Sequence, residues 1–220
     1  MQRVPAARVA VSSVAAWAVL WWWAATPGGA RFGHTRLERS PAPLAYVLVG
    51  WIVMTVAMML PTLSRPTPRE RVHVIDAALF PVGYLSVWIL AGIVAITLDL
   101  IVHATASSSI DLRPGVFALA GAYQFTRHKQ RCLTHWRPSV SWVAEAGEDR
   151  WCVFDRGARQ GWRSVGCCWA LMLLAFALGM RDLVWTVAIA AAMFVETRSE
   201  HPERWSYGAG LALISASIIA

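Results

Sequence analysis

The stretch that decides the fold is AALFPVGYLSVWILAGIVAITL, residues 77–98, which holds no charged residue and lies between Asp76 and Asp99. A helix that crosses the apolar part of a bilayer needs about 20 such residues. The apolar positions run continuously rather than at intervals of three and four, so they leave no polar face for water. This stretch therefore predicts a transmembrane helix.

Similar uncharged blocks occur along the rest of the chain, at residues 9–25, 44–60, 114–125, 164–180, 183–195 and 205–220. The block 114–125 is short, and we expect its helix to continue through Arg127, Lys129 and Arg131, whose long side chains reach the headgroups. The whole chain is 57% hydrophobic and only 15% charged, which is too apolar for an ordinary soluble domain. These features predict an all-α, polytopic transmembrane bundle of about seven helices.

The distribution of basic residues predicts the orientation of this bundle. With a cytoplasmic N-terminus, 15 of the 20 Lys and Arg residues lie on the cytoplasmic side, as the positive-inside rule expects. The net charge of +7 is then directed at lipid headgroups and not at nucleic acid. We interpret residues 1–220 as a single multi-pass domain of a plasma membrane of bacterial type. It has a cytoplasmic loop at about 127–163, and its expected partners are the bilayer and, in one alternative, other membrane subunits.

The polar loop at about 127–163 gives no sign of an enzyme. It has no recognisable acid and base pair of carboxylates, no Gly-rich phosphate loop, no nucleophile elbow and no HExxH sequence. We therefore predict no catalytic residue and no organic cofactor.

Soft donor side chains are the chemistry that remains. Thiolate, thioether and imidazole groups suit Cu(I) or zinc, and residues three or four apart on a helix share a face. This spacing predicts one stripe of Gln124, His128, Cys132 and His135, a second of Met54 and Met58, and a third of Cys168 and Met172. The candidate metal ligands are Cys132, His135, His128, Cys167, Cys168, Met58, Met54 and Met172.

Each stripe also has a plain structural explanation. Methionine at helical spacing commonly fills a core, and an isolated cysteine is commonly a small buried residue. Adjacent cysteines point about 100° apart on a helix, and a disulfide between them does not fit helical geometry. We therefore expect Cys167 and Cys168 to be free thiols.

Lys129 is the only lysine among the 20 basic residues. It lies between His128 and Cys132, where an ammonium group could pair with an acid or tune a thiol. The alternative is a charge at the end of a helix that reaches to the headgroups. Asp99 and Glu196 stand at the ends of predicted helices, and we expect both carboxylates to be interfacial.

Three sequence strings carry a resemblance to a known family. They are AMMLP at 57–61, GAYQFT at 121–126 followed by Lys129, and GCCWALM at 166–172. In this order they resemble an uncharacterised family of predicted metal-binding integral membrane proteins, over residues from about 44 to Glu196. The resemblance implies a multi-helix membrane protein that binds metal through Cys, Met and His. The family pattern has further cysteines at the positions of Trp136 and Ser164.

Three hypotheses follow for the function. The leading one is an integral membrane protein that holds or passes a soft metal ion, copper as Cu(I) or zinc. The second is a metal-free accessory subunit of a larger membrane complex. The third is a membrane thiol oxidoreductase that uses Cys132 with Cys167 or Cys168, which ranks last because the chain has no CxxC pair.

Overall fold

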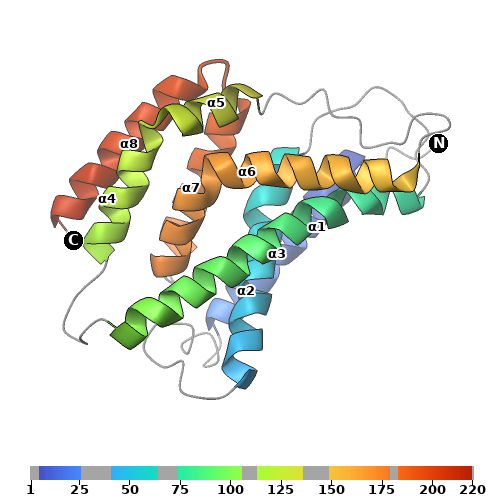
Figure 1. Ribbon diagram of the computed structural model, residues 1–220, viewed down its shortest axis with the longest axis horizontal. Coiled ribbons are helices and arrows are strands. Elements are labelled where there is room, and N and C mark those ends of the chain that lie inside the picture. Colours follow the sequence, from blue (N-terminus) through green and yellow to red (C-terminus); the bar gives the residue numbers. More distant parts are fainter. Residues whose placement is uncertain are drawn as a thin grey trace.

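The computed structural model describes residues 5–25, 41–63, 74–105, 113–135, 149–178 and 183–219. These residues form eight helices and no strand, which confirms the all-α class (Figure 1). The helices are α1 (Pro5–Ala25), α2 (Pro41–Leu63), α3 (Val74–Thr105), α4 (Arg113–Gln124), α5 (Arg127–His135), α6 (Arg150–Leu178), α7 (Leu183–Arg198) and α8 (Pro202–Ile219). The turn predicted at Arg181 and Asp182 lies outside the described residues.

The fourth predicted helix is divided in two at Thr126. The amide of Phe125 donates to the carbonyl of Ala122 at 3.2 Å, and that of Thr126 to the carbonyl of Tyr123 at 3.0 Å. These bonds span three residues and so tighten the last turn of α4. The amide of Lys129 then donates to the Thr126 hydroxyl at 3.3 Å, which is the bond of an N-cap residue. Thr126 therefore starts α5 in a new direction.

Helix α6 begins at Arg150, well before the predicted start at Ser164. Asp149 caps its N-terminus, since its carboxylate accepts from the amide of Trp151 at 3.4 Å. Between 150 and 163 most charged residues lie on an exposed face, where Asp155 and Arg159 pair at 2.6 Å, while Arg156 is partly buried. The opposite face is buried through Val153, Gly157, Gln160 and Gly161. Because charged residues interrupt its apolar positions, this amphipathic half of α6 does not appear in the sequence as a continuous apolar block.

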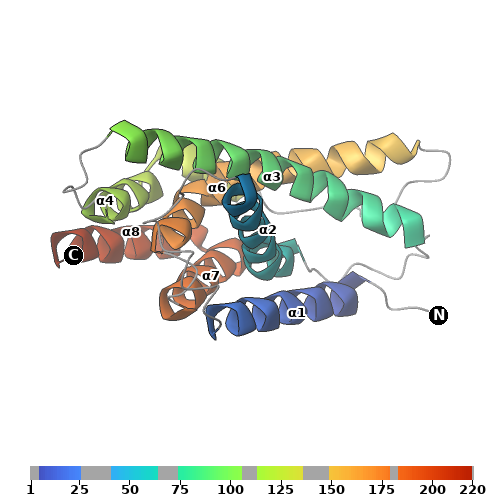
Figure 2. The same ribbon diagram turned by 90° about the horizontal axis from the view of Figure 1, so that it is seen from below.

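The backbones of α3 and α6 come into direct contact. A Cβ on Gly157 would lie 2.1 Å from the carbonyl oxygen of Phe80, and one on Gly83 would lie 2.2 Å from that of Phe154. Gly161 repeats the contact one turn later, against Tyr84. Small residues four apart allow helices to approach this closely. The two helices consequently converge along their N-terminal halves (Figures 1 and 2).

Three further contacts join α1 to α2, α2 to α3 and α4 to α8. In Figure 2, α2 lies between α1 and α3. The Ser13 hydroxyl on α1 donates to the carbonyl of Ala57 on α2 at 2.9 Å, and the Trp51 indole on α2 donates to the carbonyl of Trp88 on α3 at 2.9 Å. On the other side, Gly121 of α4 packs against Gly210 of α8.

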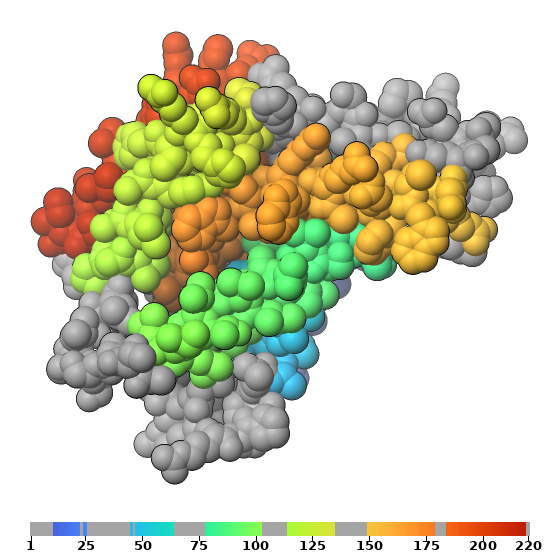
Figure 3. All heavy atoms as spheres, in the orientation of Figure 1, coloured from blue at the N-terminus to red at the C-terminus, as the bar shows by residue number. Residues whose placement is uncertain are grey.

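Only part of the predicted membrane topology is supported by the helices. Among the described residues, two helices are long and apolar enough to cross a membrane, Ala78–Val102 within α3 and Arg150–Leu178. Val11–Trp22 and Val47–Leu63 are shorter apolar helices. The seven-span arrangement is therefore not confirmed. Helices α3 and α4 lie at the surface in Figure 3. Helix α3 exposes several large apolar side chains, among them Leu90, Val94 and Leu98.

The α3–α6 contact generates a stability prediction. We expect Gly157→Ala to destabilise the protein by about 1–3 kcal/mol, because the new methyl group meets backbone and not a movable side chain. Thermal unfolding in mild detergent measures this change. Gly208→Ala in α8 is the matched control, because a Cβ there meets nothing within 4 Å. The control should be neutral or stabilising by up to about 1 kcal/mol, and equal stability of the two variants would contradict the contact.

Candidate metal centre

A thiol and an imidazole on α5 face one glycine of α6. The Sγ of Cys132 lies 3.7 Å from the Nε2 of His128, as expected for residues four apart on a helix. A Cβ on Gly166 would stand 2.8 Å from the Cys132 sulfur and 3.5 Å from that Nε2. Gly166 therefore gives Cys132 the space to lie against α6.

Cys167 and Cys168 are buried free thiols, as the sequence predicted. Their exposed fractions are 1% and 2%, and neither forms a disulfide. Their sulfur atoms lie 3.1 Å apart, and Cys167 donates to the carbonyl of Ser164 at 3.3 Å. Two sulfurs that each lie about 2.3 Å from one ion can be at most about 4.6 Å apart. These two thiols are therefore close enough to share an ion.

The Cys132 thiol belongs to the same neighbourhood. Its sulfur approaches Gly166, which directly precedes Cys167 and Cys168 in α6. The Tyr123 hydroxyl donates to the carbonyl of Gly166, which holds α4 at this point of α6. We call Cys132, Cys167 and Cys168 the thiol cluster.

Burial determines the protonation of the half-exposed member of the cluster. Burial raises the pKa of the Cys132 thiol above its ordinary value, and the neighbouring Cys168 raises it further. A metal ion must displace a proton to bind such a thiol. Cys132 is therefore a protonated thiol at neutral pH and becomes a ligand only when a metal competes for the sulfur.

The predicted methionines share the buried core with two of the cysteines. Met54, Met58 and Met172 belong to the same hydrophobic core as Cys167 and Cys168. A further sulfur, that of Met59, accepts from the Ser164 hydroxyl at 3.9 Å, one helical turn before Cys167. The spacing rule chose Met54 and Met58 because they are four apart, and it passed over Met59. The adjacency of Met59 to Met58 was the available signal.

Ser164 stands at the centre of this part of the core. Its hydroxyl lies 2.7 Å from that of the fully buried Tyr84. Ser164 therefore connects α3, through Tyr84, and α2, through Met59, to the turn of α6 that carries Cys167. Ser164 supplies a small polar group at this junction and no thiolate.

Two of the predicted residues cannot be placed. His135 ends α5, but its side chain lies outside the described part of the structure, as does all of Trp136. Within the described residues, no three side chains of His, Cys, Asp or Glu are already arranged to hold a metal ion. The thiol cluster is thus a set of neighbouring donors whose side chains must rotate to close on an ion.

A buried ion pair, which the sequence interpretation did not predict as a contact, lies beside the cluster. The ammonium of Lys129 is 2.8 Å from the carboxylate of Glu196, and the two side chains are 0% and 1% exposed. Lys129 also donates to the side-chain oxygen of Gln124, and the Ser206 hydroxyl lies 3.1 Å from the same oxygen. Lys129 therefore does not reach to the surface, and Glu196 is not interfacial in this fold.

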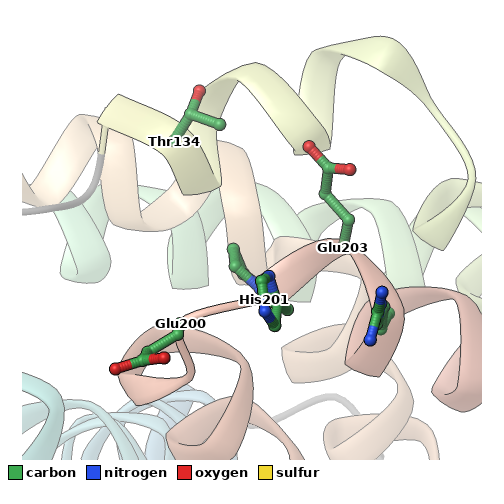
Figure 4. A pocket seen from close by; sticks show the side chains of 6 residues that line it. Thr134, Glu200, His201 and Glu203 are labelled. Atoms are coloured by element: carbon green, nitrogen blue, oxygen red, sulfur yellow. The ribbon is translucent and has the colours of Figure 1, made fainter.

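A polar pocket opens at the end of α5. Its volume is about 530 Å³, and it is lined by Thr134, Glu200, His201, Pro202, Glu203 and Arg204. Figure 4 shows Glu203 pointing toward the helix that carries Thr134, while Glu200 points away. The pocket contains no thiol, so it is distinct from the cluster, although Thr134 and Cys132 share α5.

The burial of the cysteines predicts an order of alkylation. At neutral pH, iodoacetamide should modify the exposed Cys152 first and Cys132 slowly, and it should leave Cys167 and Cys168 unmodified in the folded protein. The rate at Cys132 should rise with pH and level off at a higher pH than that of an ordinary exposed cysteine, because only the thiolate reacts. Peptide mass spectrometry measures each site, with Cys132→Ser as the control for assignment. A plateau at the same pH as that of the exposed Cys152, or below it, would contradict the raised pKa of Cys132.

Comparison with known proteins places this geometry in a family. No curated protein and no solved structure matches the chain. A family model described as "PpoB2: Copper chaperone" matches residues 48–220, which include α3 to α8 and every residue of the thiol cluster. The expectation of a metal-handling family is confirmed in this coarser, copper-related form, and the chain belongs to the PpoB2 copper chaperone family.

Proposed function

We propose that this chain binds Cu(I) as cargo through Cys132, Cys167 and Cys168 and passes it on by ligand exchange. The observation that carries the proposal is the approach of Cys132 on α5 to Gly166 on α6, the residue that precedes the two buried thiols in the chain. Cu(I) is a soft ion that prefers thiolate ligands. Membership of a copper chaperone family supports the same ion.

The three thiols suit Cu(I) without a further ligand, because Cu(I) is a soft ion that prefers thiolates. A structural zinc site is almost always tetrahedral and takes four protein ligands. Three thiols together with His128, whose Nε2 lies 3.7 Å from the Cys132 sulfur, would also make up such a zinc set. We propose copper because the family is described as a copper chaperone.

The difference in burial among the thiols suits a chaperone. Cys132 and His128 form a half-exposed edge, and Cys167 and Cys168 lie inside. An incoming ion meets the edge first, and a receiving protein can offer its own thiolate at the same edge. Each exchange then replaces one sulfur ligand by another, so copper never becomes a free ion.

Copper titration of cysteine variants tests this proposal. The reduced protein should bind about one Cu(I) in competition with a chelator. Cys132→Ser, Cys167→Ser and Cys168→Ser should each weaken binding by at least about tenfold, since even the loss of an outer-shell partner costs 10–100-fold. Cys152→Ser is the matched control, because this exposed thiol lies at the start of α6. Unchanged affinity in all three cluster variants, or a preference for zinc, would contradict the copper site.

We also propose that the protein is inserted in a membrane, with α3 and α6 crossing it and the shorter α1 and α2 packed beside them. Support comes from the apolar length of α3 and α6 and from exposed apolar side chains on α1 and α3, such as Val14, Trp22, Leu90 and Leu98. Surfaces of this kind are unfavourable in water.

Membrane insertion has a direct test. In cell lysates the protein should remain in the membrane pellet after alkaline carbonate washing and should be released by detergent. A peripheral protein held by its net charge of +7 would instead be released by carbonate or by high salt. Recovery in the carbonate supernatant would refute insertion while leaving the copper site untouched.

A further inference from the structure

The ion pair of Lys129 and Glu196 joins four helices. Lys129 lies on α5, Glu196 on α7, Gln124 on α4 and Ser206 on α8, and their side chains form one hydrogen-bonded group. Gln124 and Ser206 are both fully buried, like the pair itself. The group therefore fixes the position of α5 relative to α4, α7 and α8.

Stability alone does not account for this pair. A buried ion pair offsets the cost of removing its charges from water only when the remaining polar atoms are also bonded. Here the second carboxylate oxygen of Glu196 and the side-chain nitrogen of Gln124 have no partner among the described residues. Apolar side chains of similar volume would stabilise the bundle at least as well. Another role for the charges is therefore indicated.

The position of Lys129 suggests that role. It lies on α5 between His128 and Cys132, so the same short helix presents its thiol to Gly166 and its ammonium to Glu196. Lys129 and Cys132 are three residues apart on α5, so their side chains share a face of that helix. A cation near a thiol favours the thiolate, and an anion opposes it.

Copper binding creates a buried negative charge at this place. When two thiols bind Cu(I), two S–H bonds break, two S–Cu bonds form, the protons leave to water and copper stays Cu(I). The resulting dithiolate complex carries one negative charge, and a third thiolate adds another. An uncompensated buried charge is costly, so a fixed cation near the sulfur atoms stabilises the loaded state.

We propose that Lys129 is the counter-charge and positioning residue of the copper–thiolate centre, and that Glu196, Gln124 and Ser206 hold it in place. This inference rests on the proposed copper function. Lys129 does not bind the metal: it fixes α5 so that Cys132 faces Gly166, and its ammonium balances the charge of the loaded cluster.

Exchanging the two charges separates this role from a simple structural clamp. The double variant Lys129→Glu with Glu196→Lys keeps an ion pair between α5 and α7 but places the carboxylate beside the thiols. We expect its melting temperature to stay close to that of the wild type and its Cu(I) affinity to fall by at least about tenfold. The ultraviolet sulfur-to-copper band should also shift, because the field at the thiolates is reversed.

A neutral pair and a surface pair serve as the comparison variants. Lys129→Met with Glu196→Met fills the same space without charge and should fold, with a Cu(I) affinity between those of the wild type and the exchanged variant. Asp155→Arg with Arg159→Asp exchanges the exposed pair on α6 and should change neither the melting temperature nor the affinity.

The outcomes are distinct. Wild-type Cu(I) affinity in a folded exchanged or neutral variant would overturn the inference, and so would loss of copper binding only together with loss of the fold in both variants. Failure of the wild-type protein to bind Cu(I) would overturn the proposed function itself. If the exchanged variant does not fold, the neutral variant decides by its affinity alone.

Discussion

The position of α6 depends on glycines, because their missing side chains set how closely its neighbours approach. Gly157 and Gly161 bring the backbone of α6 against α3, and the Tyr84 hydroxyl then reaches Ser164 at 2.7 Å. One turn further, Gly166 leaves space for the Cys132 sulfur of α5. The same helix thus uses small residues first for packing and then for bringing a third thiol to the buried pair. A side chain at any of these contacts would have to displace a neighbour.

The sequence predicted those helices whose apolar residues run in unbroken blocks, because lack of charge is visible residue by residue. It did not predict the N-terminal half of α6, where charges occupy one face and glycines the other. It also missed the break at Thr126, since a single N-cap residue within an otherwise helical segment carries little pattern. For the site, helical spacing paired His128 with Cys132, while Lys129 and Glu196 are 67 positions apart. A contact over that separation depends on the packing of α5 against α7, which no local pattern encodes.

Ser164 shows how one residue can serve both the packing and the chemistry of this region. Its hydroxyl bonds to Tyr84 and to the Met59 sulfur, so the position is a junction of α2, α3 and α6. A cysteine there would add a further thiol near Cys167, three residues away on the same face. Under the proposed function the three thiols suffice for Cu(I), while zinc would also need a fourth ligand such as His128.

Burial differs across the cluster, and this difference connects the fold to metal exchange. Cys167 and Cys168 lie in the core, where a charged complex is costly unless a cation is close. Cys132 is half-exposed, and burial holds its pKa high, so this sulfur is the most readily reprotonated ligand. If the chain holds copper as proposed, protonation of Cys132 would open one coordination position at the accessible edge, while the two inner sulfurs would retain the ion. Lys129 is fixed by Glu196 at 2.8 Å. Release under the proposed function would then need rotation of one side chain on α5 and no rearrangement of the helices.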